Sequence, residues 1–172
     1  MNKELKENFK LSLQRLLPFF LSLFFIFINY TPSNVSFSTF IRPEIGLICV
    51  FYWVLYRPDL FNMFMVFLLG LINDIISSAP LGADIITYLT VYVIVSNMIA
   101  FFYNKPFVVV WYGFAFIFII AELVKWLILS VYYAQFLPIS GLFFISLFTV
   151  ACYPVVSLFN DLAQKFLMNE EA

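Results

Sequence analysis

Long runs of apolar side chains, broken only by short polar stretches, constrain this chain more than any other feature. A transmembrane helix needs about 20 mainly apolar residues, with a range of about 17–25. Six apolar segments approach or reach this length, at residues 16–30, 43–56, 60–78, 82–102, 107–132 and 139–160. Only 11% of the residues are charged, whereas a soluble domain carries about 25%. The sequence therefore predicts an all-α integral membrane protein that crosses the bilayer several times.

The 172 residues suit one compact domain. We expect a cytoplasmic N-terminal segment over residues 1–15, a transmembrane helical bundle over 16–160 and a short cytoplasmic tail over 161–172. Basic residues followed by an apolar run also occur in secretory signals, but cleavage needs small residues and the first alanine is Ala79. We therefore expect the first apolar segment to be retained as a helix.

The number of spans can be judged from the basic residues, because Lys and Arg collect in cytoplasmic loops. With six spans and a cytoplasmic N-terminus, seven basic residues lie inside: Lys3, Lys6, Lys10, Arg15, Arg57, Lys105 and Lys165. Only Arg42 lies on the other side. The second segment is short and ends at Arg57-Pro58, so five spans remain an alternative with a weaker charge bias. We predict a six-helix bundle with both termini cytoplasmic.

Polar residues gather around the stretch "GLINDIISSAPLGADIITY" between the third and fourth segments. Pro80 suits the first turn of a new helix, with Ser78 as a candidate N-cap. Gly82 permits either close approach of another backbone or a positive φ. Asp84 falls in the first turn of the fourth segment, where a carboxylate interacts favourably with the helix dipole.

Asp74 needs a partner, because an Asp at the bilayer centre costs about 2.5–3.5 kcal/mol. The free N–H groups at the start of the fourth segment have no acceptor within their own helix. We therefore expect Asp74 to tie the third helix to the beginning of the fourth. The alternatives are an outward-facing polar pocket and a contact with a partner helix.

Glu122 and Lys125 are three residues apart and share one face of the fifth segment. We expect a self-neutralising pair, with a contact to another chain as the alternative. The sequence contains no His, and Cys49 and Cys152 lie in apolar runs where we expect free, buried thiols. No motif for a phosphate, a metal, a cofactor or a catalytic nucleophile is present, and the net charge of −1 predicts no nucleic-acid binding. We therefore expect a protein that is not an enzyme.

The stretches "RPEIGLICVFYWVLYRPD" (42–59) and "FLLGLINDIISSAPLGADIITYLTVYVI" (67–94) resemble the MreD family of rod shape-determining proteins. The first stretch carries a Pro-led span that ends in Tyr-Trp and Arg-Pro, and the second carries the pattern "GL…D…PLG". The matching residues are Pro43, Tyr52, Trp53, Arg57, Pro58, Gly70, Leu71, Asp74, Pro80, Leu81 and Gly82, with Tyr153-Pro154 in the last span. The C-terminal tail departs from the family's basic pattern, with Lys165 followed by Glu170 and Glu171.

This resemblance implies a bacterial inner-membrane scaffold for cell elongation. It would bind the single-span protein MreC and act indirectly with the actin-like MreB and peptidoglycan synthases. The family's fold is also similar to the substrate-binding S components of energy-coupling-factor transporters. A small-molecule-binding subunit of such a transporter is therefore the alternative function, and a homodimer stays open.

Overall fold

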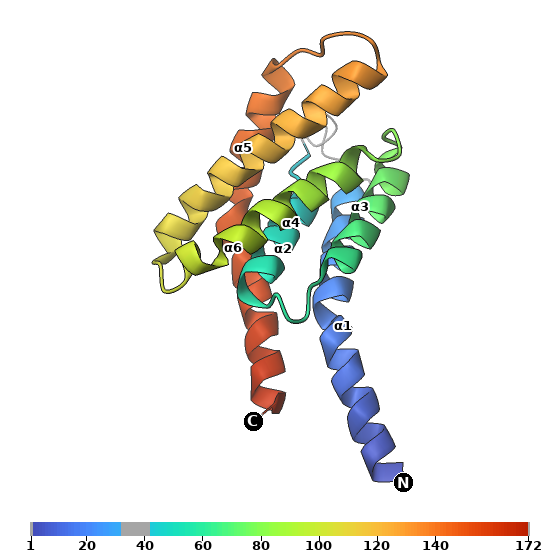
Figure 1. Cartoon of the computed structure of the whole chain (residues 1–172), viewed down its shortest axis with the longest axis vertical. Coiled ribbons are helices and arrows are strands. Elements are labelled where there is room, and N and C mark those ends of the chain that lie inside the picture. Colours follow the sequence, from blue (N-terminus) through green and yellow to red (C-terminus); the bar gives the residue numbers. More distant parts are fainter. Residues whose placement is uncertain (1, 32–41, 172) are drawn as a thin grey trace.

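The structure, a computed structural model, describes residues 2–31 and 42–171, with side chains over 16–31 and 42–165. These residues form six α-helices and no strand (Figure 1). The helices are α1 (Asn2–Tyr30), α2 (Ile45–Tyr56), α3 (Met63–Ser77), α4 (Ala83–Phe102), α5 (Phe107–Tyr132) and α6 (Ser140–Glu171). Each predicted apolar segment coincides with one helix, so the all-α prediction is confirmed.

The two terminal helices extend beyond the apolar segments. Residues 2–15 continue α1, and residues 161–171 continue α6. The beginning of α1 and the end of α6 lie at the same end of the bundle, at the bottom of Figure 1. The basic side chains Lys3, Lys6, Lys10 and Arg15, which were counted for the orientation, lie outside the described side chains.

Within the described part of the chain, three helices are long and apolar enough to cross a membrane: α4, α5 and residues 140–165 of α6. The apolar part of α1 (Leu16–Tyr30), α2 and α3 are shorter. At 1.5 Å per residue the 12 residues of α2 span about 18 Å, whereas the hydrocarbon layer is about 30 Å thick. Crossing by these three shorter segments therefore stays a prediction.

The short helix α2 forms the centre of the bundle. It contacts each of the other five helices. Every residue from Leu47 to Val54 is at most 4% exposed, so α2 is covered on all sides. A helix that is apolar all round belongs in an interior. The Phe51 ring packs edge-on against Phe102 of α4, Phe114 of α5 and Tyr153 of α6. Through these contacts α4, α5 and α6 pack around α2.

The helices α3 and α4 form a close hairpin. A Cβ atom on Gly70 would lie 2.7 Å from the Ile85 Cα, so this approach requires glycine. Gly82 has φ +106° with open space around it, which confirms the positive-φ alternative predicted for it. The prediction that Ser78 caps α4 is wrong, because Ser78 ends α3 in a left-handed conformation. Pro80 also lies before α4 and not in its first turn, since the helix begins at Ala83 after the N-cap Gly82.

The other predicted helix boundary, at Arg57-Pro58, is confirmed. Arg57 is the C-cap residue of α2 and donates its backbone N–H to the Trp53 carbonyl. Its guanidinium also pairs with Asp59, with 3.3 Å between Nε and Oδ1. Arg57 therefore lies at the opposite end of α2 from the polar cluster described next.

Candidate functional site

Asp74 joins the end of α3 to the beginning of α4. Its side chain is 1% exposed. Oδ2 accepts a hydrogen bond from the Gly82 N–H at 2.7 Å, and Oδ1 accepts one from the Asp84 N–H at 2.8 Å. These N–H groups form the positive end of the α4 dipole and suit a carboxylate partner. Because Gly82 has no side chain, Asp74 supplies from α3 the acceptor that an N-cap residue normally provides. The hydrogen bonds predicted for Asp74 are therefore present.

A second set of hydrogen bonds runs from α3 to Asp84, which is fully buried. The Asn73 Nδ2 donates to Asp84 Oδ2 at 2.6 Å, and the Ser77 hydroxyl donates to the same oxygen at 3.4 Å. Asp84 lies in the first turn of α4, as predicted. Three polar residues near the C-terminal end of α3, at positions 73, 74 and 77, therefore hold the beginning of α4.

Lys125 of α5 pairs with Asp84 of this cluster and connects it to α2. Its Nζ lies 2.6 Å from Asp84 Oδ1 and 2.6 Å from Glu44 Oε1. Glu44 is the N-cap residue of α2, and its backbone N–H donates to the Thr149 hydroxyl of α6. One ammonium group thus links α2, α4 and α5 between two carboxylates. A buried charge is tolerated when it is paired and hydrogen-bonded in this way.

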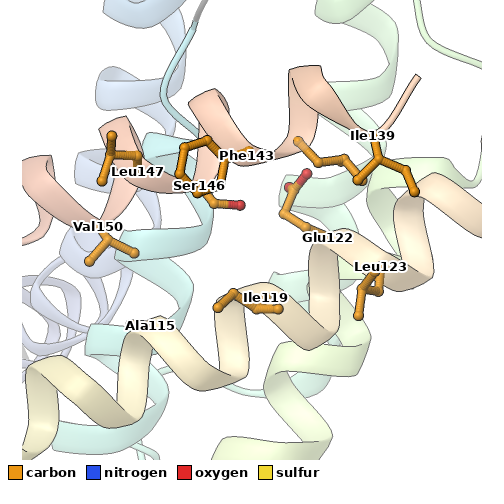
Figure 2. Close-up of a pocket in the computed structure, with 10 residues that line it drawn as sticks. Ala115, Ile119, Glu122, Leu123, Ile139, Phe143, Ser146, Leu147 and Val150 are labelled. Atoms are coloured by element: carbon orange, nitrogen blue, oxygen red, sulfur yellow. The ribbon is translucent and has the colours of Figure 1, made fainter. Parts of the chain in front are cut away.

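Glu122 and Lys125 interact electrostatically, but no close ion-pair contact joins them among the described residues. The two residues share a helix, but the recorded ion-pair partners of Lys125 are Glu44 and Asp84. Glu122 is 4% exposed, and its Oε1 has no hydrogen-bond partner among the described residues. Figure 2 shows its carboxyl group pointing from α5 toward α6. The physical reason for the difference is that two acids from other helices approach Lys125 more closely than a neighbour on its own helix.

Glu44 was missed as a site residue in the sequence analysis. It is separated from Lys125 by 81 positions, so local spacing does not indicate their contact. A signal was nevertheless present, because an acid directly before the most deeply buried apolar segment needs a compensating charge. Pro80 and Arg57, by contrast, lie outside the cluster: Pro80 is in the α3–α4 turn, where its carbonyl accepts from the Ala83 N–H.

No group of three or more His, Cys, Asp or Glu side chains that could hold a metal ion occurs in the described part of the chain. Cys49 and Cys152 are free thiols, the first buried and the second half-buried. The chemistry of the cluster is therefore that of ion pairs and charged hydrogen bonds between helices.

Comparison with known proteins supplies the family. The family model of the rod shape-determining protein MreD matches residues 10–162. The chain belongs to the MreD family. It is also similar to an uncharacterized protein of Rickettsia prowazekii (strain Madrid E), with 29% identity over 168 residues that cover 94% of each chain. No solved structure gives a significant match.

Membership of the MreD family gives the chain a role in rod shape determination and a general association with the MreB/MreC shape complex. MreD proteins are a structural, shape-determining family, and the membrane-length helices fit a membrane protein. Both stretches that resembled the family in the sequence lie within the matched region. Asp74, Gly70 and Gly82, which belong to the second stretch, together form the α3–α4 hairpin and its hydrogen bonds.

Proposed function

We propose that this protein is a non-enzymatic scaffold subunit of the bacterial elongation complex in the inner membrane. It binds an MreC-like single-span protein and, through that protein, acts with MreB-like filaments and peptidoglycan synthases. The finer parts of this proposal are the direct binding of the single-span partner and the positioning of wall synthesis. Both extend the general role that family membership gives.

The observation that carries the proposal is that the charged residues of the cluster form their ion pairs and hydrogen bonds within the chain. Asp74, Asp84, Lys125 and Glu44 pair with one another or with helix-start N–H groups, and they fix α2, α3, α4 and α5 relative to each other. A scaffold needs helices held at fixed positions so that their outer faces present a constant surface. The outer faces here carry many exposed apolar side chains, which suit lipid and partner helices.

The proposed topology is six spans with both termini in the cytoplasm, in a bundle similar to energy-coupling-factor S components. Seven basic residues against one support this orientation. The placement of the two chain ends at one end of the bundle supports it as well (Figure 1). The short helices α2 and α3 then cross the bilayer only with the help of their flanking residues.

Purification of the tagged protein from its own membranes tests the proposal. We expect a single-span membrane protein to co-purify, and we expect depletion of the chain to make rod-shaped cells rounder. Asp74→Ala should lower both the protein level and the partner yield, because it leaves two N–H groups without an acceptor. Asp59→Ala is the matched control, because Asp59 is exposed and pairs with Arg57 beside the α2–α3 turn.

Two results would contradict the scaffold function. One is turnover of a substrate by the pure protein. The other is recovery of a stoichiometric small ligand together with an energy-coupling subunit, which would favour the alternative of a transporter subunit.

A further inference from the structure

A groove of about 420 Å³ lies between α5 and α6 (Figure 2). Its walls are almost entirely aliphatic and aromatic, and they come from residues at helical spacing on both helices. The α5 wall is formed by Ala115, Ile119, Glu122 and Leu123. The opposite wall is formed by Ile139, Leu142, Phe143, Ser146, Leu147 and Val150.

Two tryptophans fix the helices at either end of this groove. The Trp111 Nε1 donates to the Val150 carbonyl of α6 at 2.9 Å. At the other end, the Trp126 Nε1 donates to the Leu137 carbonyl just before α6 at 3.0 Å. These residues are 15 positions apart, which corresponds to about 22 Å along α5. The groove is thus a fixed feature between two hydrogen-bonded ends.

Glu122 is the one acidic residue in the wall of the groove. It is 96% buried, and its Oε1 has no hydrogen-bond partner among the described residues. The nearby cation, Lys125, is already held between Glu44 and Asp84. The five charged groups Glu44, Asp74, Asp84, Glu122 and Lys125 include four acids and one base. The groove therefore favours an occupant that brings a hydrogen-bond donor.

The depth of Glu122 identifies the kind of occupant. Glu122 lies between two and three residues from the middle of α5, which is about 4 Å along the helix axis. Lipid headgroups lie about 15 Å from the bilayer centre, so they do not reach this depth. A transmembrane helix can place a polar side chain there, and such side chains bond across helix interfaces.

A second copy of this chain is a weaker candidate. The polar side chains on the outer part of α4 include Thr90, Ser96 and Asn97, and the Ser96 hydroxyl donates to the Val93 carbonyl. Thr90 donates to the Ile86 carbonyl and Asn97 to the Val93 carbonyl of their own helix. The two hydroxyl donors are therefore used within the copy that would offer them, which leaves one N–H of the Asn97 amide.

We propose that the α5–α6 groove binds a transmembrane helix of another membrane protein. A side chain of that helix donates a hydrogen bond to Glu122 Oε1. Apolar side chains of that helix fill the groove between the two tryptophans. This inference rests on the proposed scaffold function and assigns it a contact surface.

Photo-crosslinking in native membranes tests the occupant directly. A photoreactive residue is placed at Leu147 in the groove and, as the control, at Val93 on α4. We expect an adduct from position 147 but not from 93. Peptide mapping should place the crosslink in an apolar span of a different protein, within one helical turn of a residue with a side-chain donor. An adduct only with a second copy or only with lipid would overturn the proposal.

Substitutions in the groove distinguish partner binding from a structural role. We expect Glu122→Leu to lower the adduct yield about three- to tenfold, the range of interhelical hydrogen bonds in membranes, while the thermal stability of the purified protein is kept or raised. A merely structural Glu122 would lower both. Ala115→Trp should also block formation of the adduct, whereas Ala100→Trp, at an exposed position of α4, should not. Wild-type adduct yields in both groove variants would overturn the groove site, and a single-span partner that still co-purifies would leave the scaffold function intact.

Discussion

Glu122 and Lys125 lie one turn apart on α5, but they face two regions of different construction. On the side of α2, α3 and α4, the acids of the cluster have partners within the chain. Lys125 forms ion pairs with Glu44 and Asp84, and Asp74 accepts hydrogen bonds from the first N–H groups of α4. On the side of α6, Glu122 is equally buried, but its Oε1 has no described hydrogen-bond partner. We call the first region, with Glu44, Asp74, Asp84 and Lys125, the closed region, because its charged groups bond within the chain. The second, around Glu122, is the open region, because an external partner can bind there.

This difference indicates why a chain with so few charges keeps several in its interior. A charge inside a membrane protein is expensive unless it is paired. In the closed region the charges hold helices together, so removing them should lower the free energy of unfolding. In the open region the charge bonds to a partner, so removing it should weaken binding of the partner instead.

The largest expected effect is that of Lys125→Met, which leaves Glu44 and Asp84 without their shared cation. Removing one member of a buried ion pair costs about 3–5 kcal/mol. We expect the free energy of unfolding in detergent to fall by this amount. The control is Lys165→Met, because Lys165 and Asp161 form an exposed pair and such pairs contribute at most about 1 kcal/mol. Equal losses in the two variants would show that the closed region depends little on its charges.

Asp74→Ala should have an intermediate effect. Two helix-start N–H groups lose their acceptor, and an unsatisfied buried donor costs about 1–3 kcal/mol. Asp74→Asn keeps one acceptor oxygen and should lose less. Chemical unfolding of both variants measures the difference, and an unchanged midpoint for Asp74→Ala would remove Asp74 from the account of the hairpin.

Gly82→Ala should have a smaller effect of about 1–2 kcal/mol, because φ +106° is unfavourable for a residue with a Cβ atom. The matched control is Gly141→Ala in the first turn of α6, where a new Cβ meets no atom within 4 Å and φ is ordinary. Thermal unfolding of the two variants isolates backbone strain from packing. A loss as large in the control would indicate a general effect of removing glycine.

Glu122→Leu should change stability least, and any change should be a gain. It replaces a carboxylate that lacks a described partner at Oε1 by an apolar side chain beside Ile119 and Leu123. Replacing buried charge by apolar groups of similar size is often neutral or stabilising. A lower midpoint of thermal unfolding would mean that Glu122 belongs to the closed region.

The sequence predicted the parts of this structure that depend on nearby residues. The helix boundaries follow from apolar runs that end at Pro and Gly, such as Arg57-Pro58. The contact of Asp74 with the start of α4 bridges only eight to ten positions across one turn, so helix-end chemistry was enough to predict it. Ser78 was misplaced because the cap of α4 comes from another helix, which local capping preferences do not include.

The long-range ion pairs could not be predicted from the sequence. Lys125 is 41 positions from Asp84 and 81 from Glu44, and only the crossing of α2, α4 and α5 brings the three together. The spacing of Glu122 and Lys125 is compatible with a pair on one helix, but it carries no information about acids on other helices. The central position of α2 could likewise not be predicted, because an apolar helix faces lipid as readily as protein.

The comparison between the two regions is tested most directly by one paired measurement. Asp74→Ala and Glu122→Leu are purified in parallel, and both the midpoint of thermal unfolding and the yield of the co-purifying membrane partner are determined. Asp74→Ala should lower both quantities, whereas Glu122→Leu should lower only the partner yield. If Glu122→Leu instead lowers the midpoint and keeps the yield, the groove side of α5 serves the fold and not a partner.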